Sequence, residues 1–416
     1  MLSAALHRLC PPAAALHPLW LCGFRPFFLV AALGAPLFIG LWIAFLAFGL
    51  PLPAVAGGPF VWHAHELVFG VALAAVAGFA LTAIPEFTVT AAFGRRSTRR
   101  LAGLWLIGRL AFWSSGLLGA SALAVSAAAH LGLLGYLAAL LAPRLWRDPE
   151  RRHLAFLWAL AALAACVAGF YLDALLGEHP ARWLHAALGV LMMLIVVAMS
   201  RISMRIVNAA IEERATDPAT SVEYRARPPR RNLAIFCIGL YTLVELLAPG
   251  ARIGGWLALA AAAALLNLLN DWHVGRALFR RWPLMLYGVY VLMAGGYALM
   301  GAAIVLDGGF FSAGRHLAAV GAMGLAIYAV LCIAGRMHCG LPLDERLWVP
   351  TGAWLIVAGA LLRAATALPG APAAALLGLA GLAWGAAFAL YAWRMAPLFL
   401  APRADGGSGC EGILAH

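Results

Sequence analysis

Apolar stretches of about 20 residues follow one another along almost the whole chain, and this pattern decides the fold class. A helix rises about 1.5 Å per residue, so roughly 20 apolar residues span the hydrocarbon core of a bilayer. We therefore expect an all-α polytopic membrane bundle of about twelve helices, which form one domain over residues 1–416. The predicted spans lie at residues 24–49, 62–84, 101–119, 121–142, 153–176, 181–200, 230–248, 254–270, 283–306, 314–334, 350–368 and 371–396.

The composition excludes a soluble protein. Hydrophobic residues make up 64% of the 416 residues and charged residues only 11%, against about 45–50% and about 25% in a soluble domain. The first apolar stretch is also longer than the roughly 7–15 residues of a signal-peptide core, so we expect a membrane span there and no cleavable leader. The one sizeable polar loop lies at residues 201–229.

The positive charge orients the bundle. The formal net charge is +12, and all 29 basic residues are arginines that short apolar runs separate, so no basic face for nucleic acid is predicted. If each arginine is assigned to the nearest loop, 24 lie on the side of the N-terminus, and Arg109 lies inside a span. By the positive-inside rule both termini and the 201–229 loop are cytoplasmic. The arginines on the opposite side are four: Arg182, Arg252, Arg315 and Arg363.

The seven cysteines are scattered, with no CxxC and no CxxCH motif. This spacing predicts neither a disulfide framework nor covalent attachment of a c-type haem. Several of the cysteines lie in apolar runs, where a small buried hydrophobic residue is the usual role.

Ionisable residues gather at the outer ends of the predicted helices, and such residues in membrane spans are candidates for function. The segment WHAHELVFG places His63, His65 and Glu66 there. His63 and His65 point about 200° apart on a regular helix and do not easily bind the same metal, whereas His63 and Glu66 share a face. The other outer ionisable residues are Asp173, His185, Glu245, His316 and Arg363.

Neutral imidazole is a common ligand for copper, zinc and haem iron, and a bundle can direct imidazoles from several helices to one point. Two metals, or one metal and a haem, would use these histidines more naturally than one metal. His130 lies near mid-membrane and suits a ligand or a helix-to-helix hydrogen bond equally well. Arg109 requires a partner, which could be a haem propionate, a carboxylate or a carbonyl. His338 follows His316 by 22 residues, about 33 Å along a helix, so it belongs to a separate feature.

Two other classes of function stay open. In a secondary transporter or metal permease the same polar groups would line a pathway, with Arg109 and His130 near its middle. In an assembly factor without a metal the histidines would be dispensable. The sequence contains no Walker-type glycine loop, which argues against ATP-driven transport.

Several segments resemble one family. They are GFRPFF at residues 23–28, WHAHELVFGVALAAVAGFALTAIPEF from Trp62, GRL at 108–110, VGAMG after His316, HCG at 338–340, and APLFLAPRADG at 396–406. Together they resemble the NnrS family, bacterial inner-membrane proteins of about twelve spans that contain haem and copper and act in the response to nitric oxide and in denitrification. One departure is Cys339, which stands where the family pattern has a threonine.

The resemblance implies a haem- and copper-containing protein of the bacterial inner membrane that protects against nitric oxide. The haem would be b-type, because no covalent attachment motif is present. The resemblance and the depth of the residues together suggest His63, His65, His185 and His316 as outer ligand candidates, with His63, His65 and His316 on a metal, and Glu66 and Arg109 in support. His338 is carried over from its motif to the opposite face. Lipid and nitric oxide are the expected partners, and turnover, binding and cofactor delivery all stay open.

Overall fold

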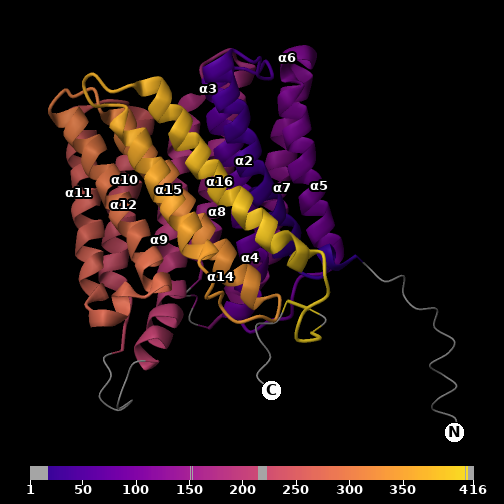
Figure 1. The fold of residues 1–416 in the computed structure, drawn as a ribbon. Helices are drawn as coiled ribbons and strands as arrows, with labels where there is room; N and C mark the ends of the chain where they lie inside the picture. Colours follow the sequence, from indigo (N-terminus) through magenta and orange to yellow (C-terminus); the bar gives the residue numbers. More distant parts are fainter. Residues whose placement is uncertain (1–16, 150, 152, 214–222, 408, 411–416) are drawn as a thin grey trace, which may run out of the picture.

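The computed structural model describes residues 17–149, 151, 153–213, 223–407 and 409–410, and in these residues every regular element is a helix. The helices stand side by side in one bundle (Figure 1). Ten of them are long and apolar enough to cross a membrane, so the expected helical membrane bundle is confirmed. These ten are α2 (Phe24–Phe48), α3–η2–α4 (Gly58–Phe87), α7 (Ala120–Arg147), α8 (Ala155–Leu175), α9 (Ala181–Glu212), α11–η4 (Arg252–Trp272), α12 (Arg281–Val305), α13–η6–α14 (Phe311–Met337), α15 (Trp348–Ala365) and α16 (Ala373–Phe399).

Two further helices, α5 (Arg95–Trp113) and α10 (Pro228–Leu247), correspond to the remaining predicted spans. They are not among the ten, because arginines occupy their first turns and interrupt the apolar run. Both nevertheless pack as part of the bundle, α5 against α7 and α10 against α9 and α11. The short helices are η1 (Pro18–Trp20), α6 (Ser115–Leu118) and η5 (Gly275–Phe279).

Two predicted spans differ most from the observed helices. The span predicted at 101–119 begins earlier, at Arg95, and ends at Trp113, because the arginines continue the helix where polar side chains reach the interface. The short helix α6 then ends at Gly119, whose φ of 61° is readily adopted only by glycine. The span predicted to end at residue 200 continues through Glu212, so α9 includes the first part of the predicted 201–229 loop.

The early helices α2–α7 lie on one side of the bundle and α10–α12 on the other (Figure 1). The last helix, α16, packs against the first long helix, α2, and so connects the last part of the chain to the first. Three of the ten candidate spans are the most enclosed: the most apolar windows of α3–η2–α4, α9 and α13–η6–α14 are 83%, 72% and 78% buried, against 33% for α2 and α16. The predicted site residues on these three spans are therefore largely shielded from lipid.

Two of these enclosed spans contain a π-helical segment directly after a candidate histidine. The segment η2 (Glu66–Ala72) follows His65, and η6 (Leu317–Met323) follows His316. A π-turn makes i→i+5 hydrogen bonds and changes the angle between successive side chains, and such turns are frequent at functional sites. The sequence does not predict either segment.

Candidate functional site

A buried polar network connects α3–η2, α5, α7 and α8 in the half of the bundle that the sequence predicts to be outer. His65 contacts Glu66 through Nδ1 (3.0 Å to Oε1) and Tyr171 through Nε2 (3.0 Å to Oη). Arg109 donates to Glu66 Oε1 at 2.9 Å and also contacts Nε2 of His130. All five side chains are buried. Of the three partners considered for Arg109, the structure thus provides a carboxylate, and His130 makes a contact between helices.

Close packing holds this network in place. The ring of His65 stacks on Phe112 with centroids 3.5 Å apart. Nδ1 of His130 donates to the carbonyl of Ser126 at 2.8 Å, which leaves Nε2 to accept from Arg109. A Cβ atom at Gly108 would lie 2.7 Å from the ring of His130. The glycine of the GRL segment therefore allows α5 and α7 to approach each other at this point.

His63 lies on a different side of the same helix, as its spacing from His65 predicts. Its ring stacks on Trp42 with centroids 4.4 Å apart, and its Nδ1 is buried without a hydrogen-bond partner in the described part of the chain. Glu66, which was expected on the same face as His63, contacts the adjacent His65 and Arg109. The π-helical segment begins at Glu66, so the regular α-helical step applies only up to this residue.

His316 lies near enough to His63 for the charge of one ring to act on the other. Its Nδ1 donates to the carbonyl of Ser312 at 2.8 Å, and Nη2 of Arg363 lies 3.4 Å from its Nε2. Arg363 also donates to the hydroxyl of Ser312 at 3.0 Å. The outer ends of α13 and α15 thus bring one imidazole and one guanidinium together, and the charges of both act on the ring of His63.

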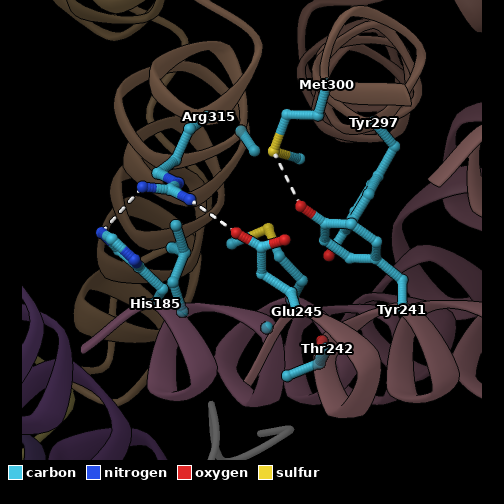
Figure 2. Close-up of a pocket in the computed structure, with 11 residues that line it drawn as sticks. His185, Tyr241, Thr242, Glu245, Tyr297, Met300 and Arg315 are labelled. Atoms are coloured by element: carbon cyan, nitrogen blue, oxygen red, sulfur yellow. Dashed lines mark hydrogen bonds and ion pairs between the residues drawn. The ribbon is translucent and has the colours of Figure 1, made fainter. Parts of the chain in front are cut away.

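His185 lies in a third place, a small cavity between α9, α10, α12 and α13 (Figure 2). Arg315 contacts Nε2 of His185 at 2.8 Å and Oε1 of Glu245 at 3.2 Å. Tyr241 points its hydroxyl at the sulfur of Met300, 3.6 Å away. The cavity volume is about 30 Å³, enough for a water-sized molecule and far too little for a porphyrin. The sequence identified His185 and Glu245 but treated Arg315 only as a topology signal; its position beside His316 could have suggested more.

His338 lies at the opposite end of the α13–α14 span from His316, as predicted. Its Nδ1 contacts the carbonyl of Cys410 at 2.8 Å, and its Nε2 lies 3.5 Å from Glu86 Oε2. Beside it, the fully buried Arg25 donates through Nη1 to the carbonyls of Phe399 and Ala401 at 3.1 and 2.6 Å. The GFRPFF, HCG and APRADG segments therefore meet here, and sequence reasoning missed Arg25 as the residue that connects them.

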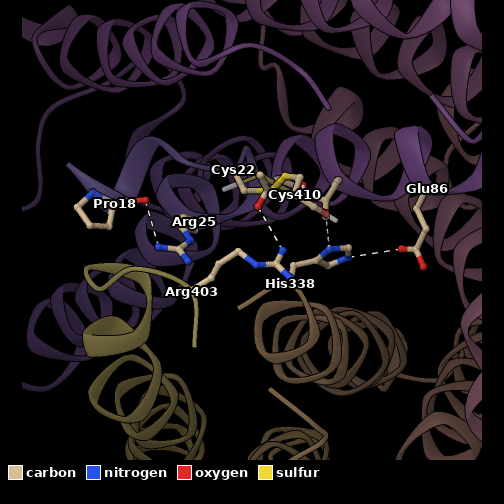
Figure 3. Close-up of a disulfide and its surroundings, with 10 residues drawn as sticks. Pro18, Cys22, Arg25, Glu86, His338, Arg403 and Cys410 are labelled. Carbon is tan, nitrogen blue, oxygen red and sulfur yellow. Dashed lines mark hydrogen bonds and ion pairs between the residues drawn. A yellow bond between two sulfur atoms is a disulfide. The ribbon is translucent and has the colours of Figure 1, made fainter. Parts of the chain in front are cut away.

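A disulfide between Cys22 and Cys410 lies at this same place (Figure 3). The expectation that the cysteines form no disulfide was wrong. The two residues are 388 positions apart with no spacing motif, and they meet only because α16 packs back against α2.

The described residues contain no group of three or more His, Cys, Asp or Glu side chains placed to bind a metal ion. His65 and His338 have both ring nitrogens in contact with polar partners. Among the described residues, His63 has an unpartnered buried nitrogen, and Nε2 of His316 has only the long contact to Arg363. Among the predicted ligands, His63 and His316 thus fit imidazole coordination best.

Comparison with known proteins gives one family. The sequence model of that family, described as NnrS protein, matches residues 18–403. This match covers the buried network, the outer histidines and the His338 region. No curated protein matches the chain.

Proposed function

The chain belongs to the NnrS family of polytopic membrane proteins, and we propose that it is a haem b- and copper-containing protein of the bacterial inner membrane that responds to nitric oxide. The observation that carries the proposal is the position of His63, whose buried Nδ1 has no partner among the described residues, close to His316. Burying a polar nitrogen without a hydrogen bond is costly, and a metal ion would compensate for the loss.

We assign the coordinating role to His63 and His316, and a supporting role to His65, Glu66 and Arg109. The supporting network is held by hydrogen bonds of 2.9–3.0 Å, so it can keep the helix bearing His63 in a fixed orientation. A haem iron or copper ion bound here would supply a redox-active centre for nitric oxide. His185 is the remaining candidate for the second cofactor, and the size of its cavity restricts that cofactor to a copper ion.

The proposed topology has twelve spans within one domain, with both termini and the 201–229 loop in the cytoplasm. The helices α5 and α10 complete the twelve; α5 has 19 residues and α10 has 20, about 28–30 Å of helix, close to the thickness of a bilayer core. Reporter fusions after residue 225 are expected to read cytoplasmic. A periplasmic reading would invert the assignment of every site to its face.

The test of function is an absorption spectrum of the purified protein, oxidised and dithionite-reduced, together with copper analysis. We expect a Soret band and bound copper in the wild-type protein, and a loss of haem or copper in His63→Ala and His316→Ala. His273→Ala is the matched control, because His273 is an exposed residue in the connection between α11 and α12; it should keep the wild-type content.

Three outcomes would contradict the proposal. Carefully prepared protein with neither a Soret band nor copper would exclude the cofactors. Unchanged content in both histidine variants would show that the coordinating residues lie elsewhere. Metal uptake into vesicles that contain the protein, without a resident haem, would favour the permease class instead.

A further inference from the structure

The disulfide between Cys22 and Cys410 joins the start of α2 to the segment that follows α16 (Figure 3). The Cα atoms are 5.1 Å apart, within the range of about 4.4–6.8 Å that a disulfide spans. Both residues are nearly buried, with exposures of 2% and 8%. Two distant parts of the chain thus place their cysteines where a bond can form without movement of the backbone.

This pair lies at the face where α2 begins and α14 and α16 end (Figure 1). That face receives most of the arginines and is the cytoplasmic face in the proposed topology. Glutathione and thioredoxin keep cytoplasmic thiols reduced, and disulfides that do form there are usually transient and often redox-sensing. A disulfide on the cytoplasmic side is therefore expected to form and break reversibly.

We propose that Cys22 and Cys410 are a reversible redox-modification site, which small disulfides such as glutathione disulfide oxidise and glutathione reduces. This inference rests on the topology of the proposed function, but not on haem or copper. In oxidation, the thiolate of Cys410 attacks the small disulfide and expels one thiolate. The thiolate of Cys22 then attacks the mixed disulfide and expels the second, so two protein thiols and one small disulfide give one protein disulfide and two small thiols. Each protein thiol loses one proton, and each released thiolate takes one up.

The segment that carries Cys410 also contacts the backbone beside a third cysteine, Cys339. The backbone amide of Ala404 donates to the carbonyl of Cys339 at 3.1 Å, and the carbonyl of Cys410 contacts His338. Cys339 is free and only 2% exposed, and burial raises the pKa of its thiol. In the oxidised protein Cys339 should therefore react slowly, and reduction should release the neighbouring segment that contacts it.

The test uses the full-length protein in native membranes, equilibrated in buffers of different ratios of glutathione to its disulfide. Mass-tag alkylation reports the state of Cys22 and Cys410, and the rate of maleimide labelling reports the exposure of Cys339. We expect the pair to be reduced at a high ratio of glutathione to its disulfide, oxidised at a low ratio, and reversible between the two states. Labelling of Cys339 should be about tenfold faster after reduction, the effect of losing one or two hydrogen bonds that keep the segment closed.

Variants separate the bond from general loosening of the fold. In the Cys22→Ser and Cys410→Ser variants, maleimide should label Cys339 at the fast rate in every buffer. Cys237→Ser should keep the difference between the two states, because Cys237 lies within α10, away from the pair. Cys332 is buried on α14, and its slow labelling in all samples reports that the bundle itself stays closed.

Two outcomes would overturn the proposal. If the pair stays oxidised at a high ratio of glutathione to its disulfide, the disulfide is structural. If it stays reduced in excess glutathione disulfide, it is not a redox pair. The fusion after residue 225 tests the premise separately: a cytoplasmic reading with an unresponsive pair refutes the redox site alone, and a periplasmic reading refutes the topology.

Discussion

Replacing Glu66 with glutamine tests whether the buried network depends on charge. Glu66 and Arg109 form an ion pair of 2.9 Å whose side chains are 0% and 5% exposed. Glutamine has nearly the same shape, so the variant removes the negative charge and leaves the guanidinium of Arg109 uncompensated in a buried position. Breaking a buried pair in this way costs about 3–5 kcal/mol, so we expect Glu66→Gln to lower the free energy of unfolding by that amount.

The assay is reversible unfolding in mixed detergent micelles, followed by tryptophan fluorescence. Glu223→Gln is the control, because the pair of Glu223 and Arg225 is 59% and 75% exposed and should contribute about 0–1 kcal/mol. The double variant Glu66→Gln, Arg109→Met removes both charges and should regain much of the lost stability.

Two results would refute this reasoning. A Glu66→Gln protein within about 1 kcal/mol of the wild type would mean that the pair is not desolvated as the structure has it. A double variant no more stable than Glu66→Gln would show that the loss does not come from the unpaired guanidinium.

Two further predictions concern residues that hold neighbouring helices together, one through close packing and one through hydrogen bonds. Gly108→Ala places a Cβ 2.7 Å from the ring of His130 and should lower the free energy of unfolding by about 1–3 kcal/mol in the same assay. Gly132→Ala is the control and should lower it little, because its Cβ would have only contacts of 3.6 Å and longer. Equal effects of the two variants would contradict the proposed close approach. Arg25→Met removes donors to three backbone carbonyls and should lower the free energy of unfolding by about 3–5 kcal/mol. Arg96→Met is the control, because Arg96 is exposed. A loss as small as that of the control would show that Arg25 is dispensable.

The sequence was sufficient where the argument depended on one helix at a time. Apolar length alone predicted a bundle of membrane helices, and a step of 100° per residue predicted that His63 and His65 face different surroundings. The position of His316 and His338 at opposite ends followed from the rise of a helix. Each of these properties is local, so the amino-acid order determines it before any tertiary contact forms.

The sequence was insufficient where the argument depended on contacts between helices. Tyr171 completes the network around His65, yet it lies 106 positions away on α8, and nothing in its neighbourhood distinguishes it from an ordinary interface tyrosine. The π-helical segment at Glu66 likewise has no signature in composition, and the contact of Glu66 with the adjacent His65 was not expected. The disulfide was missed for the same reason, because its two cysteines meet only where α16 packs against α2.

The segments that resemble the NnrS family divide into two groups at opposite faces, and their physical roles differ. At the cytoplasmic face of the proposed topology, Arg25 donates to the carbonyls of Phe399 and Ala401, groups at the end of α16 that have no partner within the helix. A cation at a helix C-terminus is also favourable for the helix dipole. This group thus closes the two ends of the chain against each other, whereas the group around His63 and His65 places imidazoles in a buried setting. Substitutions at Arg25 should therefore change stability and leave the metal content of the folded fraction intact, and substitutions at His63 should do the reverse.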